Sequence, residues 1–307
     1  MVPGVLGKLL SCNSAIINLL TSSVYLPLAS APSMLAELVR EIRKNHETVI
    51  IDEIQKLPSL LDEVHHLIEQ DQVRFILTGS SARKLKRNSV NLLGGRAWQS
   101  LLHPLVYPEI DDFDLNRYLL YGGLPQVYSS SYPLEELDAY IHTYLKEEIQ
   151  EEALVQQLAK FARFFKTVSS TNAEQVNYSN ISRDAGIPIS TVRSYFSILE
   201  DTFTGFLLEP WQGSKKRKAV SAAKWYLFDV GVANFLRGIT ALSPQSSDFG
   251  KAFEHFIAME IRANLSYQRK KEGLYFWRTY QGKEVDFIIG DHTAIEVKAS
   301  HSINDRH

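Results

Sequence analysis

Cysteine is almost missing from this sequence of 307 residues, because Cys12 is the only one. A single thiol excludes an internal disulfide framework and is typical of a reducing compartment, so we expect a cytoplasmic location. The chain also lacks an uninterrupted apolar stretch of transmembrane length, which predicts that it has no membrane partner. With 33 basic and 35 acidic side chains, the formal net charge is −2. Overall charge therefore does not indicate nucleic acid, and any basic surface must be local.

The apolar run at residues 49–51 is followed directly by Asp52 and Glu53. Three β-branched residues without alternation are typical of a strand that is buried on both faces of a parallel sheet. The two carboxylates then lie at its carboxyl end, where open α/β sheets bind ligands. This is the form of a Walker B segment, in which the first acid holds Mg²⁺ and the second acts as general base. The alternative is a buried strand that ends in two solvated acids.

Further elements surround these acids. Residues 59–70 have apolar side chains at helical spacing, and residues 73–77 form an apolar strand that ends in polar residues. Upstream, residues 24–28 are expected to form another strand, which Pro27 would restrict to an edge or a strand end. Residues 33–44 are predicted to be a helix that leads into the Walker B segment.

Four stretches together resemble a known family: VIIDEIQKLPSLLDEVHHLIE, RFILTGSSARKLKR, NLLGGRA and RYLLYGGLPQVY. They are similar to the prokaryotic AAA+-like ATPases with a C-terminal domain of uncharacterised function. The resemblance implies that ATP and Mg²⁺ bind at the sheet edge. It also implies that Thr78 or Ser80 is the sensor that orients the hydrolytic water, and that Arg96 is an arginine finger or phosphate sensor.

The same resemblance leads us to expect a P-loop near the N-terminus, of the form Gly-x-x-x-x-Gly-Lys-Ser/Thr, whose backbone cradles phosphates. The chain has Val2 in place of the first glycine and Leu9 in place of the hydroxyl that reaches Mg²⁺. Gly7 and Lys8 remain as candidate contacts to the phosphates. We interpret this P-loop as degenerate, or as missing because the chain begins after the true start.

Residues 104–152 are predicted to be a connector that ends in a helix. Residues 121–125 have the composition of a turn, Tyr-Gly-Gly-Leu-Pro. Residues 134–152 show helical periodicity, and four of their glutamates are expected to form a solvated face. These are Glu147, Glu148, Glu151 and Glu152.

A winged helix is indicated by residues 155–210. Two helices separated by a turn at Gly186 have the arrangement of a helix-turn-helix. Thr191 and Arg193 lie near the start of the second helix, where recognition helices meet base edges. Residues 206–211 and 224–228 would then be the strands of the wing.

The loop between these wing strands contains four adjacent cations, Lys215, Lys216, Arg217 and Lys218. Clustered cations on a wing tip suit phosphate contacts, so we predict DNA as a partner. The alternatives are a solvated hairpin tip and a winged helix that contacts only proteins.

A second chemical pattern lies in residues 249–299. A helix that carries Glu254 is followed by a hairpin with Asp286 on one strand and Glu296 and Lys298 on the next. This is the PD-(D/E)xK nuclease pattern, in which two carboxylates hold Mg²⁺ beside the scissile phosphate and the lysine stabilises charge. Asp286 joins the other two only if it lies opposite Glu296, which requires an odd-length turn. Paired acids also occur in ordinary hairpins.

The predicted fold is therefore α/β, in four segments. We expect a partial AAA+ P-loop-type parallel sheet core at residues 1–103, the connector at 104–152, an α+β winged helix at 153–240 and an incomplete PD-(D/E)xK nuclease-like α/β domain at 241–307. A nuclease core of this type normally continues into a helix and another strand. We therefore expect a truncated or decayed gene product.

Three functions fit these patterns. The first is an AAA+-like ATPase coupled to a DNA-binding winged helix and a nuclease-like domain. The second is a non-enzymatic DNA- or protein-binding module derived from a decayed ATPase. The third is a Mg²⁺-dependent nuclease that does not require ATP. A homo-oligomer or another protein partner fits each of them.

Overall fold

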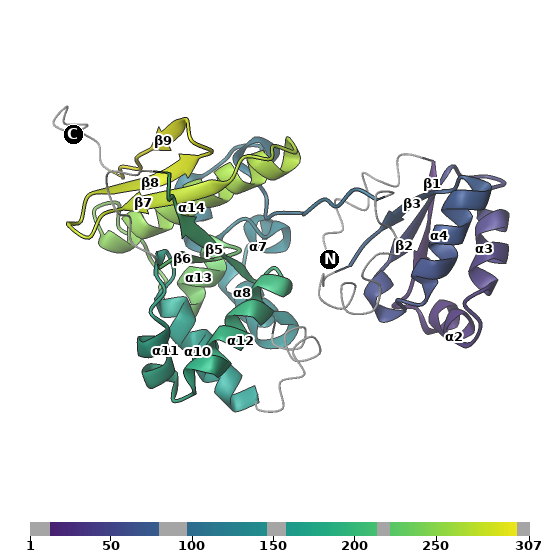
Figure 1. Cartoon of the computed structure of the whole chain (residues 1–307), viewed down its shortest axis with the longest axis horizontal. Coiled ribbons are helices and arrows are strands. Elements are labelled where there is room, and N and C mark those ends of the chain that lie inside the picture. Colours follow the sequence, from purple (N-terminus) through teal and green to yellow (C-terminus); the bar gives the residue numbers. More distant parts are fainter. Residues whose placement is uncertain (1–12, 80–96, 146–157, 214–221, 300–307) are drawn as a thin grey trace. The chain divides into compact units, whose positions relative to one another are not determined.

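The computed structural model describes residues 13–79, 97–145, 158–213 and 222–299. The chain divides into two compact units, residues 1–99 and 100–307, which we describe separately (Figure 1).

The N-terminal unit is built on a parallel sheet, as the sequence predicts, and its strand order is β1-β2-β3. Its strands are β1 (Ser14–Asn18), β2 (Thr48–Asp52) and β3 (Arg74–Leu77), and β2 is the central one. Val49, Ile50 and Ile51 are fully buried because both faces of β2 are covered. The helices are α2 (Ser22–Ser30), α3 (Met34–Ile42), η1 (Ile54–Lys56) and α4 (Leu60–Asp71). The helices expected at residues 33–44 and 59–70 are thus confirmed.

The strand expected at residues 24–28 is wrong, because these residues lie within α2. The position beside β2 is taken by β1, which pairs with β2 along its whole length. Leu28 is the one buried residue of α2. This is typical of a helix that covers a sheet through a narrow apolar stripe on its own surface. Pro27 is accommodated inside this helix.

The C-terminal unit contains a mixed sheet in the order β4-β6-β5-β7-β8-β9. The strands are β4 (Glu174–Gln175), β5 (Gly205–Pro210), β6 (Lys224–Leu227), β7 (Leu274–Arg278), β8 (Glu284–Ile289) and β9 (Thr293–Ile295). β5 pairs antiparallel with β6 through residues 205–208 and parallel with β7 through Glu209 and Pro210. The sheet therefore continues across the boundary that we placed between residues 240 and 241.

Helices surround this sheet (Figure 1). They are η2 (Tyr107–Glu109), α6 (Leu115–Tyr121), α7 (Pro125–Ser129), α8 (Pro133–Ala139), the π-helical η3 (Tyr140–Leu145), α10 (Leu158–Ser170), α11 (Tyr178–Ala185), α12 (Ile189–Asp201), α13 (Val230–Leu236) and α14 (Ser247–Tyr267). The helix predicted at residues 134–152 begins as α8 and continues as η3. Its four glutamates lie outside the described residues.

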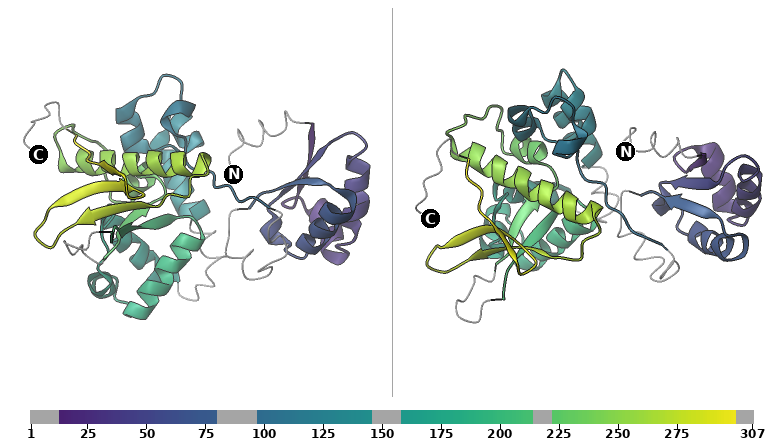
Figure 2. Two further views of the ribbon diagram at one scale, coloured as in Figure 1. Left: turned by 45° about the horizontal axis from the view of Figure 1, so that its top comes forward. Right: turned by 90° about the horizontal axis from the view of Figure 1, so that it is seen from above.

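Helix α14 lies across one face of the sheet (Figure 2). Ala258 of this helix joins Tyr226, Phe276 and Phe287 in one buried apolar cluster. A polar network fastens the same helix to β6. His255 donates from Nε2 to the carbonyl of Leu227 over 2.7 Å, and its Nδ1 lies 3.1 Å from Nδ2 of Asn172.

The turn at residues 121–125 docks on the N-terminus of α13. Asp229 caps this helix, and its carboxylate accepts hydrogen bonds from the backbone N–H groups of Val232 (2.9 Å) and Gly123 (2.8 Å). A Cβ on Gly231 would lie 2.0 Å from the carbonyl of Tyr121, so the two backbones are in direct contact. Burial raises the pKa of Asp229 to about 6. This joint makes the connector part of the C-terminal unit.

Helices α10, α11 and α12 pack around a common apolar core with β6. Phe164, Val192 and Phe196 are buried in it, as the helical spacing predicts, and Trp225 of β6 joins them. Gly186 ends α11 with a φ of 64°, the left-handed region that glycine adopts readily. Two helices joined by this tight turn confirm the predicted helix-turn-helix arrangement.

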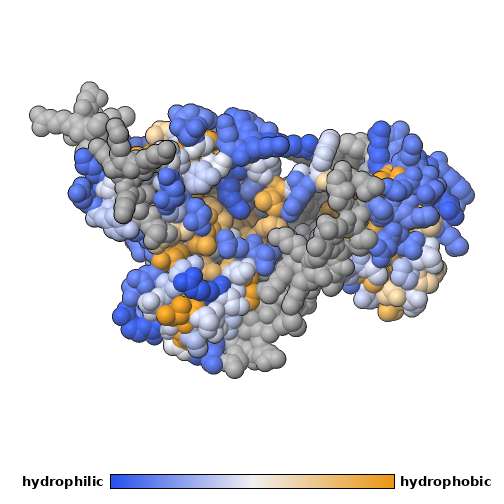
Figure 3. Space-filling model, in the orientation of Figure 1, coloured by the Kyte–Doolittle hydropathy of each residue, from blue (hydrophilic) through white to orange (hydrophobic). Residues whose placement is uncertain are grey.

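In the ranges that the structure describes, no helix is long and apolar enough to cross a membrane. On the face shown in Figure 3, hydrophilic residues dominate and apolar residues form separate, smaller patches.

We predict that His255 makes stability depend on pH. Burial lowers the pKa of His255 to about 4 from 6.5, so the unfolded chain takes up the proton first as pH falls. The stabilising contribution is present above pH 6.5 and is lost as the pH falls through 4. When the pH is lowered from about 7.5 to about 5, the free energy of unfolding should therefore decrease by about 1–2 kcal/mol less in His255→Gln than in wild type. Urea unfolding at both pH values measures this difference.

His142 is exposed and serves as the matched control. His142→Gln should keep the pH dependence of wild type. Equal loss of stability on acidification in wild type and His255→Gln would contradict the assignment.

Candidate functional site

The first candidate site lies at the carboxyl end of β2. Asp52 is the last residue of this strand and is only 1% exposed. Thr78 directly follows β3, and its Oγ1 donates a hydrogen bond of 2.5 Å to Oδ1 of Asp52. Backbone bonds from Thr78 N to Ile51 O and from Ile54 N to Thr78 O, each 3.0 Å long, hold the two strand ends together. The structure thus brings together two residues that the sequence singled out separately.

Glu53 leaves the strand in an unusual conformation. Its φ is 61°, in the left-handed region that non-glycine residues rarely adopt. The backbone N–H of Glu53 donates to Oγ1 of Thr78 over 3.3 Å, and its carboxylate accepts a hydrogen bond of 2.5 Å from Nε2 of Gln55. Rare backbone conformations of this kind concentrate at functional sites. Sequence analysis did not identify Gln55 as a site residue. Its position two residues after Glu53 is the only sequence feature that points to this contact.

The donor set at this edge fits a magnesium ion with its phosphates. Carboxylate and hydroxyl oxygens are the ligands that Mg²⁺ prefers. Asp52 is buried, so a cation bound there would offset the cost of its burial. Four other predicted residues, Gly7, Lys8, Ser80 and Arg96, lie outside the described residues, and their roles remain predictions.

The second candidate site lies on the β8–β9 hairpin. Phe287 pairs with Ile295 and Ile289 with Thr293, so continuing this register places Asp286 across from Glu296. This is the register that the spacing required. Oδ2 of Asp286 accepts a hydrogen bond from the backbone N–H of Val297 over 2.7 Å. Burial, together with Glu254 and Glu296, raises the pKa of Asp286 above its usual range.

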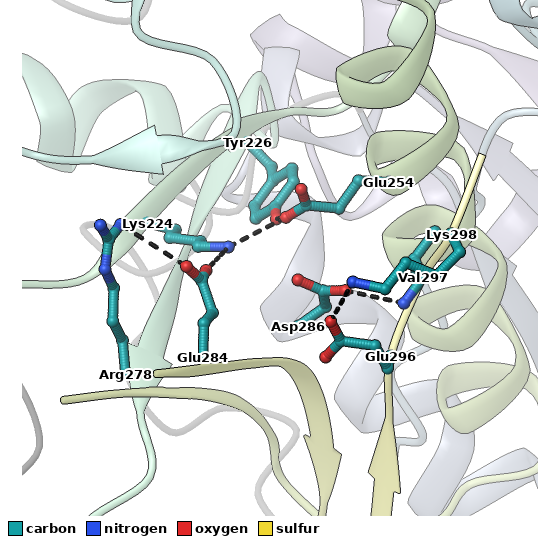
Figure 4. Close-up of polar contacts among 9 residues, drawn as sticks. All are labelled: Lys224, Tyr226, Glu254, Arg278, Glu284, Asp286, Glu296, Val297 and Lys298. Carbon is teal, nitrogen blue, oxygen red and sulfur yellow. Dashed lines mark hydrogen bonds and ion pairs between the residues drawn. The ribbon is translucent and has the colours of Figure 1, made fainter. Parts of the chain in front are cut away.

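Glu254 enters this site from α14 and meets a lysine from another strand (Figure 4). Nζ of Lys224, on β6, lies 2.9 Å from Oε1 of Glu254 and 2.6 Å from Oε1 of Glu284. The hydroxyl of Tyr226 also donates to Oε1 of Glu254, over 2.7 Å. Arg278 approaches the other oxygen of Glu284 at 3.5 Å.

Carboxylates of this kind can ligate Mg²⁺, but their present contacts do not form a metal site. Glu254 and Glu284 are engaged by Lys224, and Glu296 pairs with Lys298 at 2.6 Å. Among the residues that the structure describes, no group of three or more His, Cys, Asp or Glu is arranged to hold a metal ion. Asp286 and Glu296 are the predicted metal ligands, and they lie on the side of the cluster away from Lys224 (Figure 4).

Sequence reasoning missed Lys224, Tyr226 and Glu284 as members of this cluster. The signal was present in β6, where Lys224 is the one charged residue before three buried apolar ones. The assignment of this strand to a wing gives no reason to expect that Lys224 contacts a hairpin that begins 60 residues later.

The predicted DNA contacts divide between described and undescribed parts of the chain. Thr191 is half-buried and Arg193 is exposed on the first turns of α12. The guanidinium of Arg193 lies 4.2 Å from the ring centroid of Tyr178, a cation–π contact that holds the side chain beside α11. Lys215, Lys216, Arg217 and Lys218 lie outside the described residues.

Comparison with known families divides the chain into three segments. Residues 6–111 match the AAA domain family. Residues 112–243 match a domain of unknown function (DUF8612), and residues 249–307 match another (DUF4143). No solved structure matches the chain.

Two similar proteins are an uncharacterized protein of Mycobacterium tuberculosis and one of Haemophilus influenzae. Each is 24% identical, over 249 and 259 residues respectively, and each alignment covers 78% of this chain. The alignments cover 55% and 62% of the two relatives, so the chain spans little more than half of their length. The N-terminal part of the chain is thus similar to the AAA domain family, and the remainder is similar to two domains of unknown function.

Proposed function

We propose that the N-terminal unit binds Mg²⁺-ATP at the carboxyl ends of β2 and β3, and that the C-terminal unit binds DNA. The observation that carries the nucleotide site is the contact between Thr78 and the buried Asp52 at the end of the central strand. An acid next to a polar hydroxyl at this sheet edge supports the assignment of Asp52 as the Walker B acid and Thr78 as the sensor. The AAA domain match over the same residues supports this assignment.

The residues of this site have separate roles in the proposal. Asp52 would hold Mg²⁺, which neutralises phosphate charge when it is bound. Glu53 would accept a proton from the attacking water as general base. Thr78 keeps Asp52 in place through its hydrogen bond, and as a sensor its hydroxyl would help to orient the attacking water. Gln55 holds the carboxylate of Glu53 through its 2.5 Å hydrogen bond.

We predict that Glu53→Gln lowers ATP turnover by roughly 100-fold or more while ATP binding is retained. The amide has nearly the same shape as the carboxylate but cannot accept the proton. Calorimetric titration with Mg²⁺-ATP measures binding, and release of inorganic phosphate measures turnover.

Glu37 is exposed in the first turn of α3 and is the matched control, so Glu37→Gln should leave both quantities unchanged. Unchanged turnover in Glu53→Gln would exclude Glu53 as the base. No detectable binding of Mg²⁺-ATP to the wild-type chain would contradict the whole nucleotide site and favour the non-enzymatic binding module.

The proposal that DNA is the partner is supported by the helix-turn-helix of α11 and α12 and by the basic run at residues 215–218. Contacts of two kinds would act together. Thr191 and Arg193 would reach base edges, and the basic run would contact phosphates.

Charge removal in the basic run should weaken DNA binding and make it less sensitive to salt. Each lost phosphate contact reduces the slope of log K against log salt by about 0.9, so Lys215→Ala with Lys216→Ala should reduce it by roughly 2. Fluorescence anisotropy with duplex DNA at several salt concentrations gives this slope.

Lys270→Ala with Lys271→Ala removes two adjacent exposed lysines and is the control. It should retain the wild-type slope. The same decrease in both double variants would show that only the overall charge matters, and no decrease in either would exclude the basic run.

A second candidate function is hydrolysis of phosphodiester bonds at the hairpin site. The observation that favours it is the register that places Asp286 across from Glu296 next to Lys298. In the PD-(D/E)xK arrangement these carboxylates would hold a metal ion, and Lys298 would stabilise charge on the phosphate.

We predict that nicking of supercoiled plasmid in Mn²⁺ is abolished by Asp286→Asn and by Lys298→Ala. Asp291, in the exposed turn of the same hairpin, is the control, so Asp291→Asn should cleave like wild type. Nicking that survives in both site variants would come from a contaminating nuclease, and this second function would then be rejected.

A further inference from the structure

Lys224 is almost completely removed from solvent, although it carries a charge. Its side chain is 5% exposed, and its Nζ lies over the ring of Phe276, 5.3 Å from the ring centroid. Long side chains usually extend their charged ends into water. Here the ammonium group points inward, toward the carboxylates of α14 and β8 (Figure 4).

The two carboxylates keep this lysine charged. Burial by itself would lower the pKa of Lys224, but the charges and hydrogen bonds of Glu254 and Glu284 outweigh burial and raise it above its ordinary value. The ammonium is therefore a cation that lies between two acids. Removing one member of such a buried set leaves the others uncompensated, which is costly.

The ammonium also uses the oxygen atoms that a metal would need. Oε1 of Glu254 accepts from Lys224 and from the hydroxyl of Tyr226, and Oε1 of Glu284 accepts from the same lysine. Divalent metal ions bind carboxylate oxygens at about 2.0–2.2 Å, so they compete directly with such hydrogen bonds. The contacts of Glu254 therefore compete with any role for it as a further metal ligand.

We propose that Lys224 is a built-in cation that occupies a carboxylate site between Glu254 and Glu284, where a divalent metal ion would otherwise bind. Glu254 is then a partner of Lys224 and not a metal ligand. Asp286 and Glu296 have other partners, the backbone N–H of Val297 and the side chain of Lys298. This inference deepens the second candidate function, and only its meaning for catalysis rests on that function.

Binding of Mn²⁺ tests the proposal without requiring cleavage. Lys224→Met keeps an apolar stem against Phe276 and removes the cation. Calorimetry should show that it binds Mn²⁺ at least 10-fold more tightly than wild type. The gain should disappear in Lys224→Met combined with Glu254→Gln, because the vacated site then lacks an acid. Mn²⁺ should also raise the melting temperature of Lys224→Met more than that of wild type.

Lys251 is the matched control, because it is a partly exposed lysine of α14 that pairs with Glu174 at 2.5 Å. Lys251→Met should bind Mn²⁺ like wild type. A folded Lys224→Met variant with the wild-type affinity would overturn the proposal.

Glu254→Gln in the otherwise unchanged chain gives an independent decision if Lys224→Met does not fold. We expect the Mn²⁺ affinity of wild type to be retained, and a decrease would show that Glu254 is already a metal ligand. The outcome does not depend on nuclease activity. Loss of the second candidate function in the plasmid assay would leave the role of Lys224 unaffected, and the reverse also holds.

Discussion

The C-terminal unit depends on the double pairing of β5. The first part of this strand pairs antiparallel with β6, and its end pairs parallel with β7. Gly205 permits the close approach, since a Cβ there would lie 2.3 Å from the ring of Trp225. Because one strand joins both neighbours, the helix-turn-helix region and the hairpin with its carboxylates share a single sheet. The same pairing brings Lys224 to the carboxylates of α14 and β8.

Buried polar groups then determine how helix and sheet fit together. Two consecutive residues of α14, Glu254 and His255, each bond to β6, one through Lys224 and the other through the carbonyl of Leu227. In a low-dielectric interior such contacts stabilise only if all partners are satisfied, so they specify one arrangement. The candidate site of the N-terminal unit follows the same rule, because the buried Asp52 receives the hydroxyl of Thr78.

Local patterns predicted most elements well. The strand at residues 274–278 and the helix at 59–70 depend on apolar spacing that is visible within one segment, and the structure has both. The strand expected at residues 24–28 was wrong because apolar content alone does not show which segment pairs with β2. The hairpin register was predictable, since a three-residue turn allows Asp286 to face Glu296.

The sequence by itself determined the positions of the chemically important side chains relative to the strand ends and turns. Asp52 ends a buried strand, and the spacing from Asp286 to Glu296 allows the two to face each other across a three-residue turn. Only the tertiary structure decided which partners these acids have. Lys224 meets Glu254 and Glu284 from 30 and 60 positions away in the chain. A contact between residues so distant in sequence arises from strand order and leaves no local pattern to read.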